Sequence, residues 1–286
     1  LSLTCETFRE IFMSYQFEPG KMYRMPTHFG PSSGPRQGPD GQRFENRESP
    51  KVTTIAVSFL TNPDQLEALL PENFELSGEP VVTVAGNYLT EIEWLAGRGY
   101  NIISITLPAS FNGEEDHVTG NFMPVLWENL ADPIITGREE LGFPKIYCEL
   151  PEPTVLGDER HAIASWQGFK WLDLKVKNLH AQSAEEIAAL GAQSSDDGLL
   201  FYKYMPKTGD WGTADAAYPC LSPADSPNRV VKKRWSGEGT VEFHKARWED
   251  MPTQYNIVNT LYDLEIREYR GASVTKKVGA KDYRDQ

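Results

Sequence analysis

The stretch VVTVAGNYLTEIEW, residues 81–94, and the stretch YNIISITLPASF, residues 100–111, together decide the fold class. Both are rich in β-branched and aromatic residues and in two-residue alternation, which favour strands. Between them lies AGRG, residues 96–99, whose glycines suit a tight connection. The pattern therefore predicts a β-hairpin.

The same pattern extends outward from this hairpin. Further strands are expected over residues 51–60, 161–177 and 239–243. Helical periodicity is brief, over residues 64–70 with Asn62 as a suitable N-cap, 184–192 and 254–267. Because strands do not alternate with long helices, a doubly wound sheet or a TIM barrel fits badly. We expect a mainly β (α+β) fold, a closed or sandwiched antiparallel β-structure with a few covering helices.

One stretch cannot hold a regular element. Residues 30–49, GPSSGPRQGPDGQRFENRES, are rich in Gly, Pro and Ser and predict a long arm. The expected organisation is an N-terminal extension and arm over residues 1–49, a single domain over 50–275 and a tail over 276–286. Residues 1–13 carry two acidic residues and no basic segment, so they do not resemble a signal peptide. Met13 could be the native start, so the sequence leaves open whether residues 1–12 are native.

Composition excludes several classes of protein. The 28 Lys and Arg residues against 41 Asp and Glu residues give a net charge of −13, which disfavours nucleic acid and anionic membranes as partners. No apolar run is long enough to span a bilayer. The three cysteines are an odd number without a CxxC pair, which favours the cytoplasm. The five histidines are scattered without an HExxH motif, so we expect neither a metal nor a cofactor.

The most informative chemical segment is IITGREELGFPK, residues 134–145. The sequence predicts a strand that runs into a Gly-rich charged turn, after which Phe143 and Pro144 precede a single lysine. A lysine held among apolar groups should lose its proton more easily, and its neutral amine could attack a carbonyl carbon. The alternative is an ordinary edge-strand lysine that extends its ammonium to water. GxSxG, GxxxxGK[ST] and GxGxxG motifs do not occur.

Residues 137–145 resemble the signature of the acetoacetate decarboxylase-like superfamily, in which the lysine of a similar GRE…[YF]PK segment forms a Schiff base. Other segments resemble further landmarks of that superfamily in the same order: LLPE at 69–72, EP at 79–80, PASFNG at 108–113, YMPK at 204–207 and WSG at 235–237. The resemblance covers roughly residues 50–270. It implies a closed antiparallel barrel or cone, a homo-oligomer and a catalytic role for Lys145.

This sequence departs from the decarboxylase pattern at several positions. The second lysine that lowers the pKa of the nucleophile in the decarboxylase is replaced by Ile146. The two family glutamates fall on Ala85 and Ile102, and the arginine falls near Val52, with Lys51 the closest cation. These departures argue against acetoacetate as the substrate.

Other residues can supply the missing polar groups. His28 and Arg36 lie in residues 25–36 of the N-terminal extension and arm, a segment that could fold over the barrel mouth so that Arg36 binds a substrate carboxylate. The alternative is that this segment is a subunit contact or a solvated loop. Tyr100 should share a face with Ile102 and is either a proton donor or a core residue. Glu128 is either a general base or a salt-bridge partner.

The expected function is a Schiff-base-forming lyase that acts on a small keto acid through Lys145, of the decarboxylase or the aldolase-dehydratase type. The expected substrate-binding residues are His28, Arg36, Tyr100 and Glu128. The alternative is a non-catalytic barrel of the same fold in which Lys145 is structural. Such a protein would bind a small molecule among Trp94, Trp127 and Trp166.

Overall fold

The computed structural model describes residues 15–32, 34–35, 37–193, 197–224 and 228–281. The elements of the first half are β1 (Lys51–Leu60), α1 (Pro63–Glu67), β2 (Phe74–Leu76), β3 (Val81–Thr90), the 3-10 turn η1 (Glu93–Leu95), β4 (Tyr100–Asn112), β5 (His117–Glu128), α2 (Ala131–Thr136), the π-helical turn η2 (Gly137–Leu141) and β6 (Lys145–Tyr147). Those of the second half are β7 (Thr154–Leu156), β8 (Glu159–Trp166), β9 (Phe169–Ala181), α3 (Ala184–Gln193), β10 (Gly198–Pro206), β11 (Ala214–Pro223), β12 (Val230–Phe243), α4 (Tyr255–Tyr262) and β13 (Glu268–Val278).

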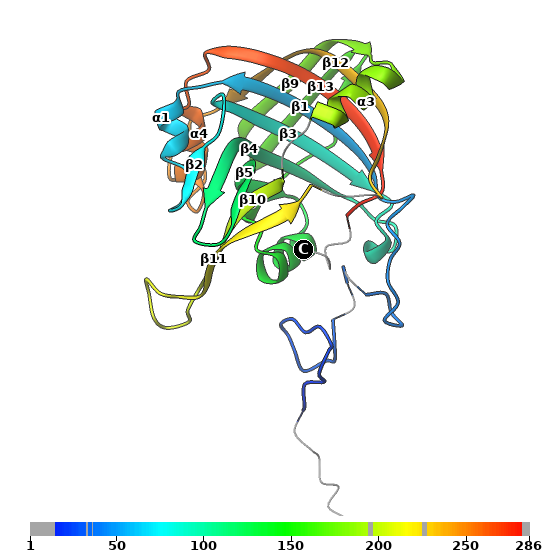
Figure 1. Ribbon diagram of the computed structural model, residues 1–286, viewed down its shortest axis with the longest axis vertical. Coiled ribbons are helices and arrows are strands. Elements are labelled where there is room, and N and C mark those ends of the chain that lie inside the picture. Colours follow the sequence, from blue (N-terminus) through cyan, green and yellow to red (C-terminus); the bar gives the residue numbers. More distant parts are fainter. Residues whose placement is uncertain (1–14, 33, 36, 194–196, 225–227, 282–286) are drawn as a thin grey trace, which may run out of the picture.

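Within the described residues the strands form one 13-stranded sheet that curls around a core (Figure 1). Its order is β11-β10-β5-β4-β3-β1-β13-β12-β9-β8-β7, with β2 paired to β4 and β6 paired to β5. The prediction of a mainly β fold with few helices is confirmed.

Closure and uniform antiparallel pairing are not observed in the described part of the chain. The order ends at β11 on one side and at β7 on the other, without a ladder between them. Two pairings are parallel, β5 with β6 and β5 with β10. A parallel neighbour requires a crossover connection. Residues 129–144, which contain α2 and η2, supply the crossover that brings β6 beside β5.

The predicted hairpin is β3 and β4, which pair antiparallel from Thr83 opposite Thr106 to Leu89 opposite Tyr100. β3 ends at Thr90 and not at residue 94, because the chain turns there through η1 and the left-handed Ala96 and Gly97. A Cβ atom at Gly99 would lie 1.9 Å from the Leu89 carbonyl oxygen, so only glycine fits beside the end of β3.

Two other local predictions are corrected. Residues 161–177 are not one strand but parts of β8 and β9, which a left-handed turn at Gln167 and Gly168 joins into a hairpin. Residues 134–141 do not begin as a strand, because they belong to α2 and η2. Pro133 is tolerated in the first turn of α2, where Asp132 also suits the helix dipole. The three expected helices occur as α1, α3 and α4, and α1 and α4 are shorter than predicted.

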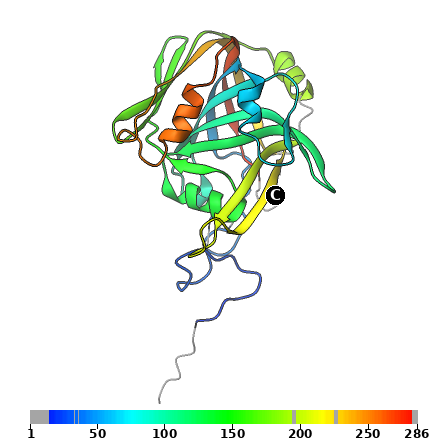
Figure 2. The same cartoon turned by 90° about the vertical axis from the view of Figure 1, so that its left-hand side faces the viewer.

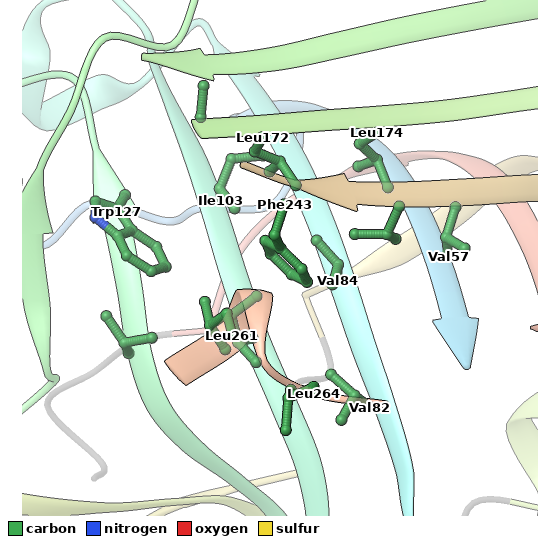
Figure 3. Packing of buried hydrophobic residues seen from close by; sticks show 14 of the residues in the cluster. Val57, Val82, Val84, Ile103, Trp127, Leu172, Leu174, Phe243, Leu261 and Leu264 are labelled. Atoms are coloured by element: carbon green, nitrogen blue, oxygen red, sulfur yellow. The ribbon is translucent and has the colours of Figure 1, made fainter. Parts of the chain in front are cut away.

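The sheet carries hydrophobic clusters on both faces. The main core gathers buried side chains from β1, β3, β4, β5, β9 and β12, and α4 covers part of it with Val258 and Leu261 (Figures 2 and 3). A smaller cluster consists of Met123, Leu126, Phe143 and Phe201. Because successive strand residues point to opposite faces, Trp127 enters the main core while Leu126 enters the smaller cluster. Lys145 pairs with Leu126 and so belongs to the second face.

Candidate active site

Lys145 begins β6 and is only 8% exposed. Its Nζ atom lies 2.8 Å from Oε1 of Glu128 and donates a hydrogen bond of 3.0 Å to the carbonyl oxygen of Pro133. The Phe143 ring lies beneath the ammonium, with its centroid 5.5 Å away. The lysine is therefore both enclosed by apolar groups and paired with a carboxylate.

Glu128, the last residue of β5, is 0% exposed. Burial raises the pKa of its carboxyl above the ordinary range, and the nearby Lys145 lowers it in part. Its Oε2 atom has no hydrogen-bond donor among the described residues. The contact therefore places a fully buried carboxyl group within hydrogen-bond distance of the Lys145 ammonium.

Gly137 creates the space that the lysine side chain occupies. A Cβ atom at this position would lie 2.3 Å from Cε and 2.7 Å from Nζ of Lys145. The Gly137 carbonyl oxygen also accepts hydrogen bonds from the backbone of Phe143, at 2.9 Å, and of the left-handed Gly142, which close the π-helical turn. Such turns often occur at functional sites.

The charged residues of this turn hold the backbone and do not contact Nζ. Arg138 donates a 2.8 Å hydrogen bond to the Lys145 carbonyl oxygen, and Lys203 donates one of 2.9 Å to the Glu139 carbonyl oxygen. Glu140 pairs at 2.7 Å with Arg24, a residue of the arm that the sequence did not single out. The Arg24–Glu140 ion pair thus fastens the arm to the turn.

A cavity of about 120 Å³ opens beside Lys145, and we call it the Lys145 pocket. Tyr100 and Leu89 line it from the sheet, and Ile92 and Trp94 line it from the turn after β3. Its other walls come from the arm, the crossover and the tail: Pro35, Pro133, Gly137 and Lys281. The two ends of the described chain thus form part of an enclosure around a buried lysine and carboxylate. Figure 1 shows the arm and the end of β13 at the same side of the sheet.

The acetoacetate decarboxylase (ADC) family model matches residues 24–279. This chain belongs to the acetoacetate decarboxylase family. It is 31% identical over 113 residues to acetoacetate decarboxylase 2 of Mesorhizobium japonicum, a match that covers 40% of this chain and 38% of that protein. It is 26% identical over 149 residues to the acetoacetate decarboxylase of Clostridium botulinum, which covers 49% and 56%. The matched stretches therefore span between about two fifths and just over half of these curated relatives.

Solved structures share the fold. The acetoacetate decarboxylase of Legionella pneumophila superposes with a TM-score of 0.61 at 20% identity, covering 85% of this chain and 90% of that one. The enduracididine biosynthesis enzyme MppR, solved in complex with pyruvate, superposes with a TM-score of 0.55 at 15% identity, covering 92% and 98%. No helix of the described residues has the length and apolar character needed to cross a membrane.

The register of the sheet relates Glu128 to a position of the family pattern. Ile102, where the resemblance places a family glutamate, lies directly opposite Glu128 in the β4–β5 ladder. Residues paired in this way point to the same face. The carboxylate absent from Ile102 is therefore present on the neighbouring strand. Ala85, the other glutamate position, lies opposite Ser104, whose hydroxyl donates a 3.4 Å hydrogen bond to the Ala85 carbonyl oxygen.

The predicted arm residues are not brought together at the pocket. His28 is exposed; its Nδ1 atom lies 3.3 Å from the Thr27 hydroxyl, and its ring lies 5.3 Å from that of Tyr15. His28 does not line the Lys145 pocket, because its segment packs within the arm itself. Arg36 lies outside the described residues, although its neighbour Pro35 lines the pocket.

The expected ligand site among three tryptophans is wrong. Trp94 lines the Lys145 pocket, but Trp127 lies in the main core with its ring centroid 4.4 Å from that of Trp171. Trp166 also packs against the main core. The three tryptophans do not share a cavity, because Trp94 lies in η1 at the Lys145 pocket while the other two belong to the main core or pack against it.

A second polar cluster lies on β8, β9 and β12. Asp173 is 4% exposed, and its carboxylate contacts His161 at 2.6 Å, His244 at 2.7 Å and Lys170 at 2.6 Å. Asp173, Glu242 and His244 are close enough to hold a metal ion. Because the Lys170 ammonium already contacts the same carboxylate, we interpret the cluster as a charged structural network.

Replacing Asp173 with Asn is expected to lower the free energy of unfolding near pH 7 by about 2–3 kcal/mol, since charge-assisted hydrogen bonds are lost. These hydrogen bonds hold the pKa of Asp173 below its ordinary value, although burial acts in the opposite direction. A carboxyl whose pKa is lowered by folding stabilises the protein above its unfolded pKa of about 3.9 and loses this contribution as the pH falls through the folded pKa. The difference between the two proteins should therefore shrink below about pH 4 in urea unfolding experiments. A constant difference would contradict the charged network.

Proposed function

We propose that this protein is a Schiff-base-forming lyase that acts on a small keto acid through Lys145. The observation that carries the proposal is the Lys145 amine at the wall of an enclosed pocket, 2.8 Å from a fully buried carboxylate. A nucleophilic lysine needs a neutral amine, a route for its proton and room for a carbonyl compound. Glu128 supplies the route for the proton, and the Lys145 pocket supplies the room for the carbonyl compound.

The first chemical step follows from these contacts. Glu128 accepts a proton from the ammonium, and the Lys145 amine then adds to the ketone carbon. The resulting carbinolamine loses its hydroxyl group as water when the oxygen is protonated, and an iminium forms. Glu128 returns the proton for this loss of water, and the Tyr100 hydroxyl at the pocket wall is the second candidate donor.

The iminium accepts electrons from the adjacent carbon atom. Loss of carbon dioxide gives an enamine, and so does loss of a proton from that carbon; the enamine can then be protonated or can add to an aldehyde. The relatives named as acetoacetate decarboxylases support the first route, and the pyruvate complex of MppR supports a 2-oxo acid as ligand. We propose this substrate class for the present chain and a homo-oligomeric assembly, which the family resemblance implies.

Borohydride trapping tests the proposal directly. The full chain is incubated separately with pyruvate and with acetoacetate, each is reduced with sodium borohydride, and the peptides are analysed by mass spectrometry. A substrate-dependent mass increment on the peptide that contains Lys145 is the expected result. An increment confined to exposed lysines, or none with any keto acid of a wider panel, would favour the alternative in which Lys145 is structural.

Acetoacetate decarboxylation is expected to be slow. Ile146 replaces the second lysine of the family pattern. Ala85 and Ile102 stand at the two family glutamate positions, and Glu128 lies opposite Ile102 only. We therefore expect carbon dioxide release from acetoacetate well below the ordinary kcat range of about 1–10³ s⁻¹. Coupled detection of carbon dioxide measures it, and a kcat within that range would contradict the expectation.

The substrate carboxylate requires a cation, because an unpaired carboxylate is costly in an apolar pocket. Lys281 lines the Lys145 pocket, and Arg36 follows Pro35, which also lines it. If Arg36 or Lys281 is the cation that binds the carboxylate, its replacement with Ala should raise KM for the keto acid about tenfold or more. The same substitution should change KM for an uncharged ketone little. Equal effects of both variants on both substrates would exclude this role for either residue.

A further inference from the structure

We propose that the protein has a second ligand site, a cavity that binds an organic anion with an apolar body. The cavity lies on the core face of the sheet, at the end where β1, β3, β12 and β13 meet the segment before β7, and its volume is about 650 Å³. We call it the Tyr88 cavity. Cavities of this size hold small organic ligands.

The floor of the Tyr88 cavity is apolar. Ile55 is 0% exposed and Val274 is 2% exposed, and the indole of Trp235 and the side chain of Val155 add further apolar surface. A hydrocarbon or aromatic group placed against these side chains would be removed from water, which favours binding in proportion to the apolar area buried.

Tyr88 is the feature that points to a ligand. It is 6% exposed, and it lines the cavity. Burial, and then the charge of Glu152, raise the pKa of this hydroxyl, so it remains a neutral O–H donor. A tyrosine hydroxyl at a cavity wall can donate a hydrogen bond to a bound ligand. An anionic oxygen in the cavity would accept this hydrogen bond.

The charge of the lining selects an anion. Arg160, Lys232 and Lys276 line the cavity, and none of the three forms an ion pair with a carboxylate in the described part of the chain. Lys51, also in the lining, is paired with Glu91. Glu152 is the one acidic lining residue, and its carboxylate accepts a hydrogen bond of 3.0 Å from Asn101. In a protein with a net charge of −13, such a concentration of cations attracts anions locally.

The Tyr88 cavity is distinct from the Lys145 pocket. Tyr88 and Thr90 line the former, whereas Leu89 between them lines the latter. Because strand residues alternate between the faces, β3 separates the two sites. A ligand of the Tyr88 cavity therefore does not contact Lys145, and the proposal does not depend on the Schiff-base chemistry.

Isothermal titration calorimetry of the full chain with octanoate, 1-octanol and acetate tests the proposal. Octanoate should bind at one site. The affinity for 1-octanol should be about tenfold lower or more, because 1-octanol lacks the charge. The affinity for acetate should also be about tenfold lower or more, because acetate lacks the apolar body. Equal binding of octanoate and 1-octanol, or no binding of octanoate, would overturn the proposal.

Variants locate the site. Tyr88→Phe removes only the hydroxyl and should weaken octanoate binding about five- to tenfold, and Val274→Trp should fill the cavity and abolish binding. Lys177→Gln, at an exposed lysine 3.9 Å from Glu238, is the matched surface control and should bind as wild type. Lys145→Ala should also leave octanoate binding unchanged. Loss of binding in Lys145→Ala, or wild-type binding in Tyr88→Phe, would overturn the assignment even if Val274→Trp failed to fold.

Discussion

The Lys145→Met variant is expected to lose keto-acid turnover by a factor on the order of 10⁴ or more, and to lose the borohydride-dependent mass increment. Methionine retains much of the length and volume of the lysine, so the packing against the Phe143 ring should persist. The amine that forms the iminium is absent, and no other lysine lies beside Glu128 among the described ion pairs. Steady-state assays and mass spectrometry on the same preparation measure the two effects together.

The double variant Lys145→Met/Glu128→Gln provides the control for folding. The single substitution leaves Glu128 buried without its cation, which is costly unless the carboxyl is protonated. The double variant removes this charge and should unfold at a urea concentration closer to that of wild type, while remaining inactive. Activity in either variant within tenfold of wild type would contradict a covalent role for Lys145.

The Gly137→Ala variant is expected to lower kcat/KM by about 10²–10³-fold, because misplacing a catalytic group by about 1 Å costs on this scale. The added methyl group would lie 2.3 Å from the Lys145 Cε atom, so the lysine must leave its position beside Glu128. The backbone of Gly137 is helical, with φ −64°, and alanine adopts it readily. The loss should therefore appear in the trapping rate without global unfolding.

Ile135→Ala is the matched control for that substitution. Ile135 lies in α2 two residues before Gly137 and is 42% exposed, so truncation of its side chain should leave kcat/KM within about twofold of wild type. Circular dichroism and urea unfolding establish that both variants fold. Wild-type trapping in Gly137→Ala would show that the lysine side chain does not need the space beside this glycine.

The sheet was largely predictable, because alternation and turn chemistry are local properties. β1 occurs with the predicted limits, and the β3–β4 hairpin follows from its strand-forming segments and the glycines between them. The helical crossover was not predictable in this way. Ile134 and Ile135 favour a strand by propensity, but the parallel pairing of β6 with β5 requires the chain to cross over at this point. The resemblance to the acetoacetate decarboxylase-like superfamily implied a closed barrel, and the strand pairing within the described residues does not show closure of the sheet.

The candidate site was predictable where the residues themselves carry a chemical pattern. The sequence indicated Lys145, Tyr100 and Glu128, and all three lie at the site. It left open whether Glu128 contacts the lysine, because the contact arises from a parallel ladder in which Leu126 is opposite Lys145. Arg24 and Lys281 were missed, since single cations near the ends of a chain form no recognisable pattern.

The walls of the Lys145 pocket also set the order in which the site can be completed during synthesis. Lys145 lies near the middle of the chain, but Pro35 belongs to its beginning and Lys281 to its end. A nascent chain can pair β3, β4 and β5 and place the lysine beside Glu128 long before β13 is translated. The pocket wall that Lys281 supplies can therefore form only after residue 281 has been translated. A partly made chain would carry the Lys145–Glu128 pair without a complete Lys145 pocket.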